Sequence, residues 1–553
     1  MDLTGQDNLW LIVAGIGVFF VIRLAVGYLA SRRVQTTADY VVAGRRLPVY
    51  LAGASIMATW FAAETIMGAS STAYELGLQG VVFDPFGAVL CLILSGLFFM
   101  RLMRRARYVT AMDFFEARYG RKMVIAGAFT QVLAYFGWTA AQIVAGGSIV
   151  QALFGVPLEL GMVIVTAIVT SYTMMGGMWA DTLLDFMQVF LTAGGITLIF
   201  VAVLRQVGGF GGLIESGGAL YVSNPWTIMG IPGEGYLGYS GHMGAFYWLA
   251  AWMAVGLGSL PAQDLIQRSM SARSESVAVG SSYLAALLYG MFGILSPLIG
   301  IGMFALKPAA AEQAGEFLII SAAVDYLSPV LASLFIAALV SALMSTSDSS
   351  LLAGASIITE NLMPAFGRPL DEKSQLRWTR IMVLAIGLMS LLIALFAATI
   401  YKLAIFAWTV LLVGQAAPFI LGFYWKKANH SGALAGFGAG FISWLVALAL
   451  YYPHTLAAVG DPEIALWDAA YISSVPAFLI CVVVIVAVSW LTQQTDPPKV
   501  LTDVDGQPLD MRHPLGLPTR LAGLAGDRDQ DGGGPDAQRR MSSRAERQAS
   551  SEG

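Results

Sequence analysis

Apolar runs of about 20 residues recur along the chain from Leu9 to Leu491, and no other feature of the sequence constrains the fold as strongly. An α-helix of this length matches the thickness of a bilayer. Of the 553 residues, 57% are hydrophobic and only 12% are charged. Soluble globular proteins carry about 25% charged residues. The pattern therefore predicts an all-α protein that crosses a membrane many times, and it excludes an ordinary soluble enzyme.

Thirteen stretches are predicted to be transmembrane helices, and together they form a transmembrane domain over residues 1–491. Their approximate ranges are 9–30, 48–76, 81–100, 123–153, 159–175, 183–204, 242–262, 278–305, 328–361, 381–400, 403–424, 431–452 and 468–491. Residues 492–553 are rich in Pro, Gly, Asp and Arg, and such a composition buries too little apolar surface to fold. We expect this segment to be a disordered cytoplasmic tail.

The basic residues divide unevenly between alternate connections. Connections on one side hold 19 Lys and Arg, whereas those on the other side hold three, namely Arg205, Lys307 and Lys402. Cytoplasmic connections of membrane proteins carry the excess of Lys and Arg. The pattern predicts a multi-pass protein of the cell (inner) membrane, with its N-terminus outside and its C-terminus in the cytoplasm.

Charge and motif content also exclude several functions. The net charge of −4 indicates no nucleic-acid partner. The four histidines are scattered without metal-ligand spacing, and no nucleophile–base pair is visible, so the sequence predicts that the protein is not an enzyme. The lipid bilayer is the partner that the composition implies, and nothing in the sequence indicates an oligomeric state.

Two of the predicted helices contain breaks. Gly53 and Gly68 bracket a polar and aromatic centre in the stretch 48–76, and the stretch 242–262 ends with Gly256, Gly258 and Pro261. The two stretches lie five helices apart, and interrupted helices at corresponding positions of two halves are typical of inverted-repeat transporters. This interpretation places the repeats at about 48–204 and 242–452, with extra helices at 9–30 and 468–491. Close helix packing by small residues is the alternative explanation of the glycines.

The stretch 328–361 carries seven polar residues within the ten positions 341–350. Ser345, Asp348 and Ser349 share one helix face. Hydroxyl groups on one face, together with carbonyls of an unwound helix opposite, can replace the water around a small hard cation. A carboxylate at this depth costs about 2.5–3.5 kcal/mol, so Asp348 is expected to hold a cation, a proton or a bundle partner.

Other acidic residues also lie within apolar stretches. Asp185, in the sixth stretch, is the strongest candidate for ion binding. For Glu64 and Asp84, two positions remain open: a buried site, or a water-filled outer vestibule.

Three motifs together resemble the sodium:solute symporter family from about residue 36 to 490. They are Met344-Ser345-Thr346 continuing to Ile358-Thr359-Glu360; Gly176-Gly177-Met178-Trp179 followed by Asp185 and Gln188; and Gln263, Gln267-Arg268 and Ser271-Ala272. The resemblance implies a leucine-transporter-type fold with a five-plus-five inverted repeat and thirteen helices. It also implies sodium-coupled import of a small organic solute by alternating access, with Na+ as the coupling ion.

The resemblance further implies positions for the ions. The main sodium site would use the carbonyls of Ala58, Phe61 and Ala342 and the hydroxyls of Ser345 and Thr346. A possible second sodium or proton site maps to Asp185, Asp348 and Ser349, beside Ser345. Asp348 departs from the relatives, which usually carry a small or hydroxyl residue there.

The solute is expected between the interrupted helices and the fourth helix. The predicted solute contacts are Thr59, Trp60, Glu64, Thr65, Trp138, Gln142, Trp248, Trp252 and Ser259. Val255 and Ser259 replace the aromatic pair of sodium/proline symporters, and Thr65 replaces the glutamine of sugar symporters, which disfavours both solutes. Carboxylates, amino acids and amines remain open. A proton-coupled transporter of the same fold and a transporter-like membrane sensor are the alternative functions.

Overall fold

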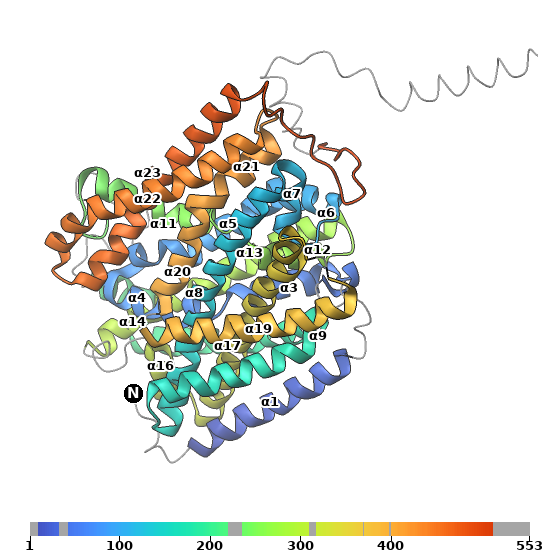
Figure 1. Ribbon diagram of the computed structural model, residues 1–553. Helices are drawn as coiled ribbons and strands as arrows, with labels where there is room; N and C mark the ends of the chain where they lie inside the picture. The colour runs from blue at the N-terminus through green and yellow to red at the C-terminus, as the bar shows by residue number, and fades with distance from the viewer. Residues whose placement is uncertain are drawn as a thin grey trace, which may run out of the picture.

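The computed structural model is built almost wholly of helices and describes residues 9–31, 42–218, 235–308, 317–368, 370–396 and 400–512 (Figure 1). The first half contains α1 (Leu9–Ser31), α3 (Val49–Trp60), α4 (Ala69–Leu76), α5 (Ala88–Leu94), α6 (Met100–Ala106), α7 (Ala111–Tyr119), α8 (Arg121–Phe154), α9 (Leu158–Gln206) and α10 (Gly209–Gly218). Short π-helical turns at Glu64–Gly68, Val82–Gly87 and Ser95–Phe99 connect some of these elements.

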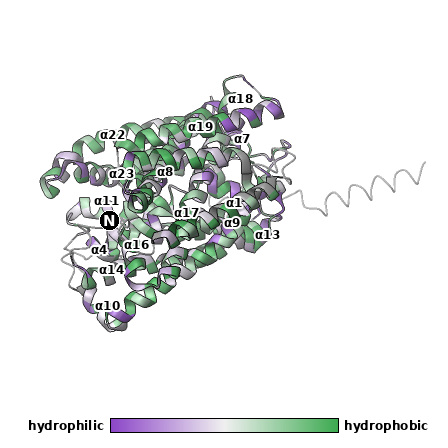
Figure 2. Ribbon diagram, turned by 90° about the horizontal axis from the view of Figure 1, so that it is seen from below, coloured by the Kyte–Doolittle hydropathy of each residue, from purple (hydrophilic) through white to green (hydrophobic). Residues whose placement is uncertain are grey.

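The second half is also built of helices. It contains α11 (Gly241–Gly256), α12 (Gln263–Met270), α13 (Glu275–Gly293), α14 (Leu295–Leu306), α16 (Leu318–Tyr326), α17 (Pro329–Ser356), α18 (Met363–Ala365), α19 (Glu372–Phe396), α20 (Ile400–Leu411), α21 (Ala417–Tyr424), α22 (His430–Val459) and α23 (Pro462–Leu491). Hydrophobic residues cover most helices, and hydrophilic residues gather near α18 at one end (Figure 2).

Within the described residues, nine helices are long and apolar enough to cross a membrane, and the apolar helices Val49–Trp60 and Leu158–Met174 are shorter. This result confirms the prediction of an all-helical multi-pass protein, while the number thirteen stays a prediction. The predicted stretches fall mainly on these helices, but 159–175 and 183–204 both lie in α9, whose helical backbone continues for 49 residues. The intervening segment contains no proline, so the backbone hydrogen bonds need not stop there.

The helices differ in how deeply they are buried. α8, α17 and the α20–α21 pair are the most enclosed of these spans, whereas α19 and α22 are the least enclosed. α22 and α23 pack together at one side of the bundle, and α1 packs on α17 and α9 at another (Figure 1). The polar stretch of α17 therefore lies in the interior, where backbone carbonyls, other side chains or a ligand must satisfy it.

The break in the second predicted helix spans fewer residues than the stretch between Gly53 and Gly68. α3 ends at Trp60, Phe61 has φ −84° and ψ 70°, and helical geometry resumes at Ala63. Gly53 and Gly68 instead lie inside helical segments. A Cβ on Gly53 would lie 2.9 Å from the Leu284 side chain, so this glycine serves close helix packing, the alternative explanation.

The break in the seventh predicted helix lies where the sequence predicted it. α11 ends at Gly256, the chain turns through residues 257–262, and α12 begins at Gln263. A Cβ on Gly258 would lie 2.4 Å from the Trp408 carbonyl oxygen. A glycine is therefore required for this turn to pack against α20.

The predicted disordered tail is wrong for residues 492–512, which pack on one end of the bundle; residues 513–553 lie outside the described residues. Leu501 and Leu509 are buried, and the backbone N–H of Val504 donates to the Ala106 carbonyl at 3.2 Å. Tyr108 donates its hydroxyl hydrogen to the Thr502 carbonyl. Composition failed here because two apolar side chains and backbone hydrogen bonds to a preformed surface suffice to order a short polar segment.

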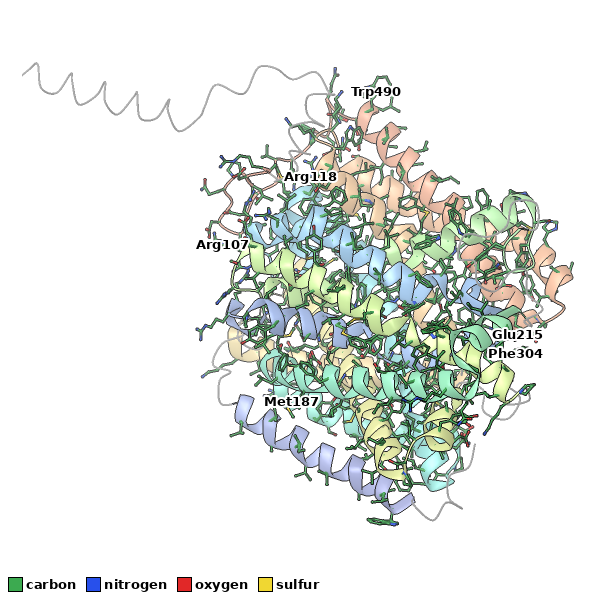
Figure 3. The ribbon with its side chains drawn as sticks, turned by 180° about the vertical axis from the view of Figure 1, so that it is seen from behind. Arg107, Arg118, Met187, Glu215, Phe304 and Trp490 are labelled. Carbon is green, nitrogen blue, oxygen red and sulfur yellow. The ribbon has the colours of Figure 1, made fainter. Side chains whose placement is uncertain are left out.

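The basic connections meet at this same end, which we call the basic end. Arg45 donates to the Arg107 carbonyl at 2.6 Å, and Arg104 donates to the Ala272 carbonyl at 2.8 Å. Arg105 forms a salt bridge with Glu275 at 2.8 Å. Figure 3 shows Arg107 and Arg118 on this side and Glu215 and Phe304 on the opposite one. The structure thus places basic connections that are far apart in the sequence at one end of the bundle, which agrees with the uneven distribution of Lys and Arg between alternate connections.

Arg118 provides a test of how the basic end is held together. Its buried guanidinium donates to the carbonyls of Gly422, Trp425 and Lys426 at 2.9–3.0 Å, and also to that of Lys499. A lysine cannot reproduce this planar set of donors. We expect Arg118→Lys to cost about 2 kcal/mol and to lower the midpoint of thermal unfolding in detergent. Arg121→Lys, at an exposed position, is the control, and an equal effect of both variants would contradict the prediction.

Candidate functional site

The break after α3 lies directly against the polar stretch of α17. The Thr346 hydroxyl donates to the Thr59 carbonyl at 2.8 Å. Ala62 donates its N–H to the Trp60 carbonyl at 3.0 Å rather than to Ala58, its partner in a regular helix. The break thus leaves backbone carbonyls facing α17 at membrane depth, where an unsatisfied carbonyl costs free energy.

All five residues of the predicted main sodium site are buried in this region. They are Ala58, Phe61, Ala342, Ser345 and Thr346. Three of the predicted ligands are carbonyl oxygens and two are hydroxyls, the donor types that a hard cation such as Na+ prefers. The structure brings the α3 and α17 segments into contact, as a shared ion requires.

A buried polar cluster continues from Ser345 towards α9 and α12. Arg268 donates to Asp181 at 2.7 Å and lies 4.0 Å from Asp185. Ser55 donates to Asp185 at 2.6 Å, and Ser345 donates to the other oxygen of the same carboxylate. Ser349 completes the cluster through hydrogen bonds with Asp181 and Arg268.

The charges of this cluster do not balance. Ionised Asp181 and Asp185 carry two negative charges, and Arg268 supplies one positive charge. Asp185 is fully buried, so an uncompensated carboxylate there is costly. One bound Na+ or one proton would remove the excess negative charge.

Asp348 occupies a different hydrogen-bonding environment from the other predicted second-site residues. It is buried and accepts a hydrogen bond from Thr173 of α9. Asp185 and Ser349, by contrast, both lie beside Asp181, because Ser345 contacts Asp181 and Asp185 and Ser349 donates to Asp181. The residues of the predicted second site therefore fall into two environments, one at Asp185 and Ser349 and the other at Asp348 on α17.

An aromatic cluster lies beside the α3 break and consists of Trp60, Trp138 and Trp408, with the Glu64 carboxylate at its edge. The ring centroid of Trp408 is 4.9 Å from that of Trp138 and 5.9 Å from that of Trp60. Glu64 accepts hydrogen bonds from Trp138 Nε1 and Gln142 Nε2, both at 2.7 Å. Four predicted solute contacts, Trp60, Glu64, Trp138 and Gln142, are thus brought together.

Thr65 belongs to a neighbouring hydroxyl network. Its hydroxyl lies within hydrogen-bond distance of Asp84, of the Trp60 carbonyl and of the Tyr289 hydroxyl, and it can donate to one of them at a time. Tyr289 donates to Asp84 at 2.7 Å. Asp84 and Glu64 are 3% and 5% exposed, so the buried alternative is correct for both.

The remaining predicted solute contacts bond or pack mainly with residues outside the aromatic cluster. Thr59 bonds through its hydroxyl to the Ser55 carbonyl at 2.7 Å and contributes its own carbonyl to Thr346. Trp248 and Trp252 are half-buried on α11, and the Trp252 ring packs against Phe86 at 6.5 Å. Ser259 is buried in the turn after α11.

Sequence reasoning missed several residues of the site. Asp181 lies one helical turn before Asp185, and Asp264 lies one turn before Arg268, so helical spacing offered a signal for both. Trp408 and Tyr289 gave no such signal, because tryptophan and tyrosine in apolar helices are usually packing residues. Only the packing of α20 and α13 against α3 brings them to the site.

Comparison with known proteins gives a consistent result. The family model "Sodium:solute symporter family" matches residues 40–440. Human high affinity choline transporter 1 is 28% identical over 451 residues, covering 76% of this chain and 74% of its own length. The osmoregulated proline transporter OpuE of Bacillus subtilis is 26% identical over 457 residues, covering 79% and 88%. The family and these relatives are transporters, which confirms that the protein is not an enzyme.

A solved structure of a sodium-coupled sialic acid symporter, in a substrate-bound outward-open state, aligns with a TM-score of 0.70. The alignment covers 87% of this chain and 97% of that chain at 20% identity. This likeness shows that the chain has the leucine-transporter-type fold.

The α17 hydroxyls give a direct test of the main ion site. We expect Ser345→Ala combined with Thr346→Ala to raise the Na+ concentration for half-maximal transport about tenfold or more, because two ligand oxygens are lost. Ser347→Ala is the matched control, since its hydroxyl bonds to the Leu343 carbonyl of its own helix at 2.7 Å. Transport assayed against a Na+ series in proteoliposomes gives the measurement, and an unchanged Na+ dependence would remove both residues from the site.

Proposed function

The chain belongs to the sodium:solute symporter family, and on that premise we propose that it imports a small organic cation together with Na+. The proposed architecture is the five-plus-five inverted repeat with thirteen transmembrane helices, working by alternating access. The protein is a multi-pass membrane protein of the cell membrane. The proposed orientation places the N-terminus outside and the basic end in the cytoplasm.

The observation that carries the choice of solute is the environment of Glu64. This buried carboxylate receives hydrogen bonds from two neutral donors, Trp138 and Gln142, and forms no salt bridge within the described part of the chain. The adjacent tryptophan rings offer electron-rich faces to a cation. A substituted ammonium ion would satisfy both the carboxylate and the rings. The human relative is named as a choline transporter, in agreement with this chemistry.

The Glu64 carboxylate also disfavours an amino acid such as proline as the solute, although one relative is named as a proline transporter. The solute carboxylate would approach Glu64 and be repelled by it in a medium of low dielectric constant. Val255, at one of the two positions where sodium/proline symporters carry aromatic residues, is 3% exposed and buried in α11.

Coupling follows from the position of the proposed main sodium site. Na+ held between α3 and α17 would fix the break next to Trp60, and the solute pocket would then be complete only when the ion is bound. Coupling is this difference in solute affinity between the two states. At ~100 mV one Na+ supplies about 2.3 kcal/mol, and a tenfold gradient adds about 1.4 kcal/mol. This sum sustains roughly 500-fold accumulation before the charge of the solute is counted.

Proton coupling is the second candidate, and the excess negative charge of the Asp181–Asp185–Arg268 cluster favours it, because a proton would neutralise that charge as well as Na+ does.

A sensor role has less support. The described part of the C-terminal segment packs on the bundle through residues such as Leu501 and Leu509.

Purified protein in liposomes tests the proposal with choline as the probe. We expect an inward Na+ gradient to drive choline uptake, and an inside-negative potential to raise it further, because both ions carry positive charge inward. A pH gradient alone is expected to drive no uptake. Uptake driven by the pH gradient without Na+ would establish proton coupling instead, and absence of any cation uptake would contradict the proposed solute.

Glu64→Gln tests the recognition of the positive charge. Removal of the carboxylate charge is expected to weaken choline binding about tenfold or more. The uncharged isostere 3,3-dimethylbutanol should then bind about as well as choline, because the variant no longer favours a positive charge. The measurement is Na+-dependent thermal stabilisation by each compound. Glu116→Gln, at an exposed position of α7, is the control. Equal weakening of both compounds would show that Glu64 has only a packing role.

A further inference from the structure

One face of α8 carries a row of polar and aromatic side chains that leads from the aromatic cluster towards the basic end. The row consists of Gln142, Trp138, Tyr135 and Gln131, spaced four, three and four residues apart, so these side chains share one helix face. Gln142 and Trp138 bond to Glu64, whereas Tyr135 bonds to Asp264 at 2.7 Å. Gln131 donates to the Pro261 carbonyl at 2.6 Å.

Asp264 is a second buried carboxylate that forms no salt bridge with the described residues, although the Arg268 charge lies close enough to interact with it. It is 0% exposed and accepts hydrogen bonds from Trp60 Nε1 at 2.6 Å and from the Tyr135 hydroxyl. Arg268, one turn further along α12, contacts only the Asp264 carbonyl, at 3.5 Å, while its guanidinium pairs with Asp181. No salt bridge reaches the Asp264 carboxylate in the described ranges. The proposed mechanism assigns this charge no role.

Asp264 and Glu64 accept hydrogen bonds from different tryptophans of one aromatic cluster. Trp60 and Trp138 both pack against Trp408, yet their indole N–H groups donate to different carboxylates. α12 runs from Asp264 to the basic end, where the Ala272 carbonyl at its end accepts from Arg104. Asp264 therefore lies between the aromatic cluster and the basic end.

Two buried oxygens beside this route have no hydrogen-bond partner among the described residues. They are Oε1 of Gln131 and Oγ of Ser259, and both side chains are 0% exposed. Buried polar atoms normally have partners, and exceptions point to a ligand, to water or to a second conformation. Here both atoms flank the turn after α11, which is one of the two breaks of the bundle.

We propose that Asp264, Tyr135 and Trp60 form a second, inner subsite, which the cationic solute occupies after it leaves Glu64 and before it reaches the basic end. The physical need for such a subsite is the cost of moving a charge through a low-dielectric interior. A second carboxylate divides that movement into two shorter steps. The inference rests on the proposed cationic solute and adds a position on its path.

The same hydrogen bonds would also make Asp264 a simple tie between α12, α3 and α8, so the test must separate the two roles. Membrane vesicles of both orientations expose one face of the full-length protein at a time. The half-saturating choline concentration is measured at the basic end in inside-out vesicles, and at the opposite end in right-side-out vesicles. A second measurement in each orientation gives the half-saturating Na+ concentration.

For Asp264→Asn, we expect the half-saturating choline concentration at the basic end to rise about tenfold, while the value at the opposite end changes less than about threefold. The Na+ values should not move. Asp264→Glu keeps the charge and should restore the wild-type choline value at the basic end. Asp468→Asn is the matched control, because Asp468 also accepts from two tyrosines, Tyr239 and Tyr247 at 2.7 and 2.8 Å, away from this route.

Equal changes at both ends, or a shift in the Na+ values, would show a structural tie and overturn the inner subsite. An unchanged choline value at the basic end would overturn it as well. If Asp264→Asn does not accumulate in the membrane, Tyr135→Phe decides, since it keeps the ring and removes one donor; a selective rise at the basic end supports the subsite and no rise overturns it. Wild-type vesicles that move no organic cation would overturn the proposed function itself.

Discussion

The backbone carbonyls at the break after α3, which groups outside that helix must satisfy, are the constraint on which the rest of the structure depends. A broken helix inside a membrane must satisfy its backbone without water. Here Thr346 donates to the Thr59 carbonyl, and the hydroxyls of Thr65 and Tyr289 lie within hydrogen-bond distance of the Trp60 carbonyl. α17, α13 and the chain after the break are therefore drawn to one point. A cation at the same point would satisfy the carbonyls more strongly than neutral hydroxyls do.

The interior also holds more negative charge than its described positive groups balance. Arg268 offsets one of the two carboxylates at Asp181 and Asp185, while the side-chain hydrogen bonds that Glu64 and Asp264 accept from described residues come from neutral N–H and O–H donors. Such an arrangement is costly in an empty protein and becomes favourable when cations enter. A transporter for cations requires this difference, because the bound and empty states must differ in free energy for coupling to occur.

Several features could be read from the sequence because they depend on local composition. The apolar runs predicted the helices, and the polar residues of 341–350 predicted a buried polar face on α17. Gly258 marked a real break, because no side chain fits against the Trp408 carbonyl. Gly53 misled, since a glycine that permits helix packing looks the same in a sequence as one that permits a turn. Leu501 and Leu509 were too few to signal the docking of residues 492–512.

The sequence alone determined that the chain crosses a membrane as helices, that its family is that of sodium-coupled symporters, and that Ser345, Thr346 and Asp185 are candidates for ion contacts. It did so because hydropathy, helical spacing and short motifs are local properties of the chain. Only the tertiary structure decided that Trp60 bonds to Asp264, Trp138 to Glu64 and Arg268 to Asp181. These partners lie 74 to 204 residues apart, and such pairings depend on how whole helices pack, which no local pattern contains.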